Sequence, residues 1–508
     1  MVYIDSNSGQ NWLLPPSLLE LIPQDHVCFL VESFVNSQDF SSFDIRYAGV
    51  GHPAYHPRII LKLLIMGVLD RIRSSRRLAR NSRENVVYMY LSEKLTPDFR
   101  TISDFRKNNP VLIKDLFVHT VTLAKNEGFL DLSTLATDGT KLKANAANKS
   151  VLSKDELSFL LNFIDLEFEE WTDKDLDEDV FFNNLRGSDQ LPNSSKKKMQ
   201  RAIKHYMSKF QDTNSDFKTV LKSKLELASS ELQKHDLKKV NITDPESRFM
   251  PSKKGKIEFS YNPQITTERN GFILANDVCN KPTDNDQLQP QVLQTKHNLI
   301  ELPKNAKWCF DAGYYGGENI HFLNEQKIDA YLVGHKEESS DAYAKDKFKY
   351  SAKKDEYVCP EGQKVIFQKV EFDKTKNKSL RIYKGVNCKQ CLKNGDCIKS
   401  KSRIRKIKDY PYRAEREQMA KKMKTKKAKE TYKLRKQIVE FPFGDLKENK
   451  GILNFLTRSL ETVKTEFNLI SIANNLSKIT KHRIQKEKQE IINMLNAMSS
   501  GFKIMTAN

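Results

Sequence analysis

A short apolar stretch that ends in a single carboxylate is the feature that most constrains this chain. In residues 132–146, LSTLATDGTKLKANA, the apolar run stops at Asp138, and Gly139 and a basic, small-residue segment follow. A strand that ends in this way lifts a charged side chain out of its sheet where backbone can approach a ligand closely. Asp138 is therefore a candidate metal ligand, although a strand followed by a surface turn gives the same pattern.

Two further acids lie in settings that fit the same site. In residues 307–320, KWCFDAGYYGGENI, an apolar run again ends at an acid, Asp311, and Glu440 lies in the helical pattern TYKLRKQIVEFPFGDLK. Hard cations such as Mg²⁺ take carboxylate oxygens, and a pair of ions can hold both oxygens of a phosphoryl displacement. The three acids together indicate chemistry on nucleic-acid strands.

Five segments occur in a fixed order from Asp138 to Phe467: DGTKLKANA, YNPQ, FDAGYYG, VEFPFGDLKENKG and NFLTRSLETVKTEF. Together they resemble the bacterial DDE insertion-sequence transposases, nearest the group named for insertion sequence 1182, and the resemblance covers about residues 14–479. The resemblance implies a mixed α/β fold with an RNase H-like catalytic core, in which Asp138, Asp311 and Glu440 match the acidic triad. It also implies two Mg²⁺ ions, for which Mn²⁺ can substitute.

The spacing around Glu440 departs from the signature of related transposases, Tyr-x2-Arg-x3-Glu-x6-Lys. Here one extra residue separates Arg435 from Glu440. On an ideal α-helix five positions place these two side chains roughly 140° apart, whereas Lys436 shares the face of Glu440. The spacing therefore questions the role of Arg435. The candidate DNA contacts in this segment are Tyr432, Arg435, Lys436 and Lys447.

Two questions about this segment stay open in the sequence. Lys447 returns to the face of Glu440 on a continuous helix, but Pro442 could kink that helix. Glu461 and Glu466 are alternative third acids. Glu440 is preferred because its VEFPFGDLK context carries the family resemblance.

The charge balance favours a polyanionic partner, because 85 Lys and Arg residues stand against 65 Asp and Glu residues, a net charge of +20. Residues 401–436 hold 16 basic and 4 acidic residues, and residues 71–91, RIRSSRRLARNSRENVVYMYL, resemble part of the helical N-terminal domain of the same transposases. Either segment could be a solvated helix face. Their place beside a candidate nuclease core favours DNA contact. The candidate N-terminal contacts are Arg73, Arg76, Arg77 and Arg80.

A chain of 508 residues exceeds one simple core, so several modules are expected. The predicted order is a helical N-terminal DNA-binding domain (1–125), the first part of the RNase H-like core (126–149), a helical insertion (150–245), the core continued (246–335), a Cys-containing insertion (336–410), a basic helix with C-terminal core helices (411–485) and a tail (486–508). Within the core, Asn270-Gly271 predicts a tight hairpin between two strands.

Four of the seven cysteines fall in the second insertion in a C-x28-C-x2-C-x5-C spacing. Thiolates at a Cys-x2-Cys turn can bind Zn²⁺ tetrahedrally, but four reduced thiols in a small β-rich insert fit the spacing equally well. The candidate zinc ligands are Cys359, Cys388, Cys391 and Cys397.

The expected function is that of a DNA transposase, which cleaves transposon ends and transfers strands into target DNA with the help of a divalent metal. Its expected partners are terminal repeats, target DNA and a second copy of the chain, since two ends must be joined. A structure-specific nuclease and a catalytically idle DNA-binding protein are the alternatives. No apolar run approaches the roughly 20 residues of a membrane helix, and the first residues lack signal-peptide features, so a cytoplasmic, nucleoid-associated bacterial protein is expected.

Overall fold

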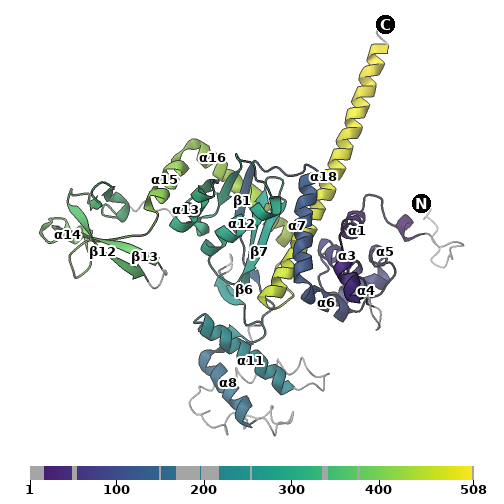
Figure 1. Cartoon of the computed structure of the whole chain (residues 1–508), viewed down its shortest axis with the longest axis horizontal. Coiled ribbons are helices and arrows are strands. Elements are labelled where there is room, and N and C mark those ends of the chain that lie inside the picture. Colours follow the sequence, from purple (N-terminus) through teal and green to yellow (C-terminus); the bar gives the residue numbers. More distant parts are fainter. Residues whose placement is uncertain are drawn as a thin grey trace, which may run out of the picture.

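The computed structural model describes residues 17–47, 54–147, 150–167, 195, 217–251, 255–334, 341–373 and 378–505. A central sheet with its helices lies between a group of N-terminal helices on one side and a smaller, separate sheet on the other (Figure 1). This mixture of helices and strands fits the expected α/β class. Most of the expected helical insertion, residues 168–194 and 196–216, lies outside the described residues.

The N-terminal region is helical throughout its described length. Its elements are η1 (Leu18–Leu21), α1 (Cys28–Asn36), α2 (Ser41–Tyr47), α3 (Pro57–Leu69), α4 (Ser75–Glu84), α5 (Val86–Leu91), α6 (Phe99–Asn108) and α7 (Pro110–Asn126). Helix α3 begins with Pro57 at its first turn, and His56 Nδ1 accepts a hydrogen bond from Arg58 N at 3.2 Å. Lys62 is fully buried in this helix, and its Nζ lies 3.1 Å from a Glu93 carboxylate oxygen, so its charge is paired.

Seven strands form the central sheet: β1 (Thr134–Gly139), β2 (Leu142–Lys143), β5 (Arg248–Pro251), β6 (Ile257–Glu268), β7 (Ile273–Cys279), β8 (Lys307–Phe310) and β9 (Asp329–Leu332). The order is β2-β6-β1-β8-β9, with β5 and β7 also paired to β6. Strands β1, β8 and β9 are parallel, and β6 runs antiparallel to β1. Parallel neighbours end at the same edge of a sheet, where ligands bind in open α/β sheets. The ends of β1 and β8 therefore meet at one edge.

The Asn270-Gly271 hairpin joins β6 to β7 as its sequence predicts. Gly271 has a φ of +81°, a conformation that glycine adopts readily. The buried Glu268 carboxylate accepts hydrogen bonds from the backbone N–H groups of Asn270 at 2.9 Å and Phe272 at 2.8 Å. A third N–H, that of Asp131, donates to the same carboxylate at 2.8 Å, which ties the hairpin to the segment before β1.

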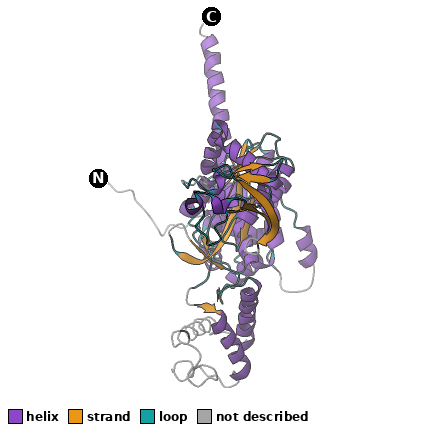
Figure 2. Cartoon of the chain, turned by 90° about the vertical axis from the view of Figure 1, so that its left-hand side faces the viewer, coloured by secondary structure: helices purple, strands orange, loops and turns teal. Residues whose placement is uncertain are grey.

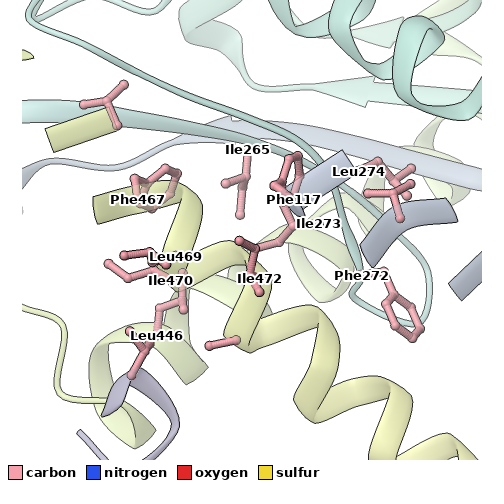
Figure 3. Packing of buried hydrophobic residues seen from close by; sticks show 14 of the residues in the cluster. Phe117, Ile265, Phe272, Ile273, Leu274, Leu446, Phe467, Leu469, Ile470 and Ile472 are labelled. Atoms are coloured by element: carbon pink, nitrogen blue, oxygen red, sulfur yellow. The ribbon is translucent and has the colours of Figure 1, made fainter. Parts of the chain in front are cut away.

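Helices α12 (Leu288–Leu299), α13 (Gly317–Glu325) and α18 (Leu460–Met505) complete the core around the sheet. Figure 3 shows Phe467, Ile470 and Ile472 of α18 packed with Ile265 of β6 and Ile273 of β7. Burying each such side chain stabilises the fold by about 1.5–3 kcal/mol. These contacts fasten α18 to the sheet.

The C-terminal part of α18 extends away from the body in both views (Figures 1 and 2). The sequence predicts a tail over residues 486–508, whereas the structure continues the helix to Met505. Residues 486–490, KEKQE, are strong helix formers, which favours continuing the helix beyond the predicted boundary. None of the described helices is long and apolar enough to cross a membrane.

The Cys-containing segment forms a second sheet of antiparallel strands: β10 (Lys349–Ser351), β11 (Glu356–Val358), β12 (Lys364–Asp373), β13 (Lys378–Gly385) and β14 (Lys406–Asp409). It has its own small core, made of Phe348, Tyr357, Val365, Tyr383 and Ile407. The segment expected to be helical also contains two strands. Strand β3 (Val151–Ser153) precedes α8 (Lys154–Glu167), β4 (Lys239–Asn241) follows α11 (Phe217–Lys234), and the two strands pair with each other.

A helical segment with two π-helical turns leads into α18. It consists of α15 (Arg413–Lys424), α16 (Lys426–Arg435), the π-helix η9 (Lys436–Glu440), α17 (Phe441–Gly444) and the π-helix η10 (Asp445–Asn449). Helix α16 packs against β8 and β9, and η9 packs against β1 and β6. The segment expected to carry the third acid thus lies against the strands that carry the other two.

Candidate active site

Asp138 and Asp311 lie at the ends of neighbouring parallel strands and share one cationic partner. Asp138 is the next-to-last residue of β1, and Asp311 follows β8 directly. The residues just before them, Thr137 and Phe310, are paired in the sheet. Arg435 Nη1 lies 3.1 Å from Asp138 Oδ2, and Arg435 Nη2 lies 3.0 Å from Asp311 Oδ1. One guanidinium group therefore bridges the two carboxylates.

Burial sets the electrostatics of this pair. It raises the pKa of Asp138 to about 6, and the positive charge of Arg435 opposes this rise more than the charge of Asp311 adds to it. The Asp138 side chain is 19% exposed and that of Asp311 is 40% exposed, so the first carboxylate is the more desolvated. A nearby cation therefore stabilises the charged form of Asp138 more than that of the more exposed Asp311.

The π-helical turn η9 accommodates the extra residue between Arg435 and Glu440. A π-helix closes its hydrogen bonds from i to i+5, so it adds one residue to a turn without shifting the helix on either side. The 140° separation expected on an ideal α-helix does not apply here, and Arg435 points to the aspartates. A side chain of β6 supports this turn, because Thr267 Oγ1 donates a hydrogen bond to the backbone carbonyl oxygen of Ile438 at 3.1 Å.

Glu440 ends η9 and is exposed. Among the residues that the structure describes, no three Asp, Glu, His or Cys side chains are arranged so that they could hold a metal ion. The structure thus brings Asp138 and Asp311 together on one cation, and Glu440 follows five positions after the arginine that supplies it.

The other residues of the signature also gather around the pair. The guanidinium carbon of Arg435 lies 5.7 Å from the ring centroid of Tyr432. Burial raises the pKa of Tyr432 to about 12. Lys447 Nζ donates to Thr140 Oγ1 at 2.5 Å, two residues after Asp138. Pro442 does not separate Lys447 from the site, because it occupies the first turn of α17. Lys436, in contrast, is exposed.

The donor set of the two aspartates fits a hard cation. Their carboxylate oxygens are ligands of the kind that Mg²⁺ prefers, and Arg435 shows that both groups reach one shared cation. Mg²⁺ is commonly held by one or two carboxylates, with waters and substrate phosphates as its other ligands. Two aspartates are therefore enough protein ligands to start such a site.

The structure places a third carboxylate, that of Asp284, beside the pair. Asp284 precedes the short 3-10 helix η5 (Asn285–Gln287), but its side chain makes no capping bond. Its Oδ1 instead accepts from Asn262 Nδ2 at 2.6 Å and Gln264 Nε2 at 2.9 Å on β6. No local pattern in the sequence indicates this position.

The structure separates the N-terminal arginines into two groups. Arg73 is only 10% exposed, and its Nη1 lies 2.9 Å from both Glu466 Oε1 and the Asn454 carbonyl oxygen. Arg73 is therefore an internal contact rather than part of a DNA-binding surface, because its side chain is largely buried and pairs with Glu466 inside the protein. The other three candidate contacts, Arg76, Arg77 and Arg80, are exposed.

The structure also shows where the two alternative third acids, Glu466 and Glu461, lie. Glu466 is buried, and besides Arg73 it accepts from the backbone N–H groups of Leu456 and Thr457. Its oxygens hold the loop before α18 in place. Glu461 is exposed in the first turn of that helix.

The four cysteines of the second sheet line one cavity together with Arg405 and Phe348. All four are free thiols, and Gln363 N donates to Cys359 Sγ at 3.2 Å. Burial raises the pKa of Cys397, and the three neighbouring thiols act in the same direction. Thiols of this kind fit zinc chemically, but in the described structure no three of them are placed to hold the ion.

Two family models match the chain. Residues 358–480 match the model described as a transposase DDE domain, and residues 16–108 match the model described as a transposase domain (DUF772). No curated protein matches the sequence. The first span includes Arg435, Glu440 and Lys447, whereas Asp138 and Asp311 lie outside both spans.

The fold and the site define an α/β protein in which two acids at adjacent strand ends face a basic helical segment. The two family matches indicate which class of protein this is. They point to a DDE-type transposase of the insertion-sequence kind.

Proposed function

We propose that this protein is a DNA transposase of the group named for insertion sequence 1182, with an RNase H-like core that cleaves transposon ends and joins them to target DNA. The observation that carries the proposal is the convergence of Asp138 and Asp311 on one cation at adjacent strand ends. That geometry occurs in a chain with two separate matches to transposase domains.

In this proposal the acids Asp138 and Asp311 bind divalent metal, and Glu440 completes the ligand set from the exposed end of η9. Bound Mg²⁺ or Mn²⁺ supplies the activation of water, and later of a DNA 3′-hydroxyl, and stabilises the leaving oxygen. The chain's own residues position the DNA. Arg435 and Lys447, which point to the two aspartate turns, are placed to bind phosphate oxygens there.

The surface beside the site suits a DNA backbone. Helices α15 and α16 and the start of η9 present a set of exposed lysines, namely Lys421, Lys426, Lys427, Lys429, Lys433 and Lys436. Phosphate contacts of this kind position a duplex without reading its sequence, and they weaken as salt rises. The exposed arginines of α4 are proposed to contact the terminal repeats.

The oligomer and the cysteines are further parts of the proposal. Two transposon ends must be processed together, so the active complex is proposed to contain two copies of the chain. The four clustered thiols are proposed to bind one structural zinc ion after a small inward movement. One zinc per purified chain would support this, whereas zinc-free protein in which all seven cysteines react with a thiol reagent would support four unligated thiols.

The proposal is tested with purified protein, Mg²⁺ and DNA that carries the flanking ends of its own gene. Expected products are cleaved ends and strands joined to a target. Asp138→Asn, Asp311→Asn and Glu440→Gln should each abolish both products and leave end binding largely intact, and Glu461→Gln serves as the exposed control on the neighbouring helix. Cutting without joining would indicate a structure-specific nuclease, and salt-sensitive binding without turnover an idle DNA-binding protein.

A further inference from the structure

We infer that Asp284 is a positioning residue, which fixes the turn after Asp138 and the turn after Asp311 relative to each other. Asp284 lies between β7 and α12, and its carboxylate reaches the ends of both β1 and β8. The consequence for catalysis rests on the proposed function, but the contact itself does not.

Two glycines show how closely the carboxylate fits between the turns. A Cβ atom at Gly139 would lie 2.9 Å from Asp284 Oδ1, and a Cβ atom at Gly313 would lie 3.1 Å from Asp284 Oδ2. Neither glycine has a positive φ. At Gly139 the Cβ atom would also lie 2.2 Å from Gln264 Nε2, so this position requires glycine for space. At Gly313 a methyl group would fit only if the Asp284 carboxylate moved by a few tenths of an ångström.

A hydrogen-bond network holds Asp284 in this position. Its Oδ1 accepts from Asn262 Nδ2 at 2.6 Å, Gln264 Nε2 at 2.9 Å and Lys141 Nζ at 3.3 Å. Gln264 Oε1 in turn accepts from the hydroxyl of Tyr314, which is fully buried three residues after Asp311. The network thus joins the segment after β1, strand β6 and the segment after β8.

This arrangement favours positioning over metal binding. Three donors already occupy Oδ1, and Oδ2 faces the Gly313 backbone, so the carboxylate is engaged on both sides. Losing it would free both turns to shift. A displacement of about 1 Å between reacting groups can slow an enzyme by a factor on the order of 100.

A double-mutant cycle tests the contact without any assay of activity. Gly313→Ala should lower the melting temperature in the wild-type background, because its methyl group crowds Asp284 Oδ2. In an Asp284→Ala background the same change should cost little, since the crowding atom is gone. Equal losses in the two backgrounds would overturn the inference. This readout decides the contact even if the protein proves unable to cut DNA, the result that would reject the proposed function.

Kinetics on transposon-end DNA then separate positioning from ligation. Asp284→Ala should lower kcat by a factor on the order of 100 with KM for DNA nearly unchanged. Asp284→Asn keeps the shape and can still accept from Asn262 and Gln264, so it should restore most of the activity. Asp286→Asn, two positions on and paired with Lys281, is the matched control and should behave as wild type. An Asp284→Asn variant as slow as Asp284→Ala would contradict a positioning role.

Discussion

Arg435 and Asp138, 297 positions apart in the chain, form an ion pair of 3.1 Å at the end of the central sheet. The same guanidinium also reaches Asp311 at 3.0 Å. A divalent ion that used these two oxygens would have to displace the guanidinium. Metal binding by these two oxygens would therefore compete with the Arg435 contact.

This competition predicts opposite effects of Arg435→Gln on metal binding and on cleavage. Without the guanidinium, the two carboxylates repel each other and should bind Mn²⁺ more tightly in the absence of DNA, measured by titration of free Mn²⁺. End cleavage should fall by a factor on the order of 100, because a positioned cation at the reacting phosphate is lost. Lys436→Gln, at the adjacent exposed position, should leave the Mn²⁺ affinity within about threefold of wild type, because Lys436 does not contact the two aspartates. Unchanged Mn²⁺ affinity in Arg435→Gln would rule out the competition.

The sequence predicted the parts of this site that depend on local pattern. A short apolar strand followed by a lone acid and small residues located both Asp138 and Asp311, and Asn270-Gly271 located the hairpin next to the start of β1, at the other edge of the sheet. These features can be predicted from short stretches of sequence, because strand ends and tight turns are determined by neighbouring residues.

The parts that the sequence could not give depend on distant partners. Arg73 and Arg76 look alike in the sequence, and only Glu466, 393 positions from Arg73, distinguishes them. The ideal-helix geometry misplaced Arg435, because the π turn that redirects it is supported by packing against β1 and β6. The place of Asp284 beside the site depends on donors from strand β6, about 20 positions earlier in the chain, which no local pattern indicates.

The two groups of N-terminal arginines should respond differently to substitution. Arg73→Gln breaks a buried ion pair and should destabilise the protein by about 3 kcal/mol with little loss of DNA affinity at a temperature where the fold is kept. Arg76→Gln, exposed on α4, should leave the melting temperature nearly unchanged and reduce the salt dependence of DNA binding by about one charge. Thermal unfolding and binding titrations at several salt concentrations separate the two. The reverse pattern would return Arg73 to the DNA-binding surface.

Glu268 should make the stability of the fold depend on pH. Burial raises its pKa to about 7, although three backbone N–H groups act in the opposite direction. The folded protein then binds more protons than the unfolded chain between about pH 4.5 and 7, so stability is highest below this window and falls as the pH rises through it, by up to about 3 kcal/mol.

Denaturation midpoints at pH 5 and pH 8 check the effect of Glu268. Glu268→Gln should be less stable than wild type at pH 5, because one amide oxygen replaces a carboxyl group that accepts three N–H groups, and the difference should narrow at pH 8. Glu258→Gln, on the same strand and partly exposed, should not alter the pH dependence. A difference that widens toward pH 8 would show that Glu268 is stabilising as the anion.

Deleting Gln437 should convert η9 into an ordinary α-helical turn without loss of the site. Gln437 is exposed within the π-helix, and its removal leaves three residues between Arg435 and Glu440, the spacing of the transposase signature. Because the π turn holds the one extra residue, the helix on either side keeps its phase, and end cleavage should stay within about tenfold of wild type. The matched control is the deletion of Lys433, an exposed residue of α16, where no π turn can compensate for the missing residue. It should rotate Tyr432 by about 100° relative to Arg435 and abolish cleavage in a protein that still folds. A folded but inactive Gln437 deletion would mean that the π geometry itself, rather than the placement of Arg435 and Glu440, is needed for cleavage.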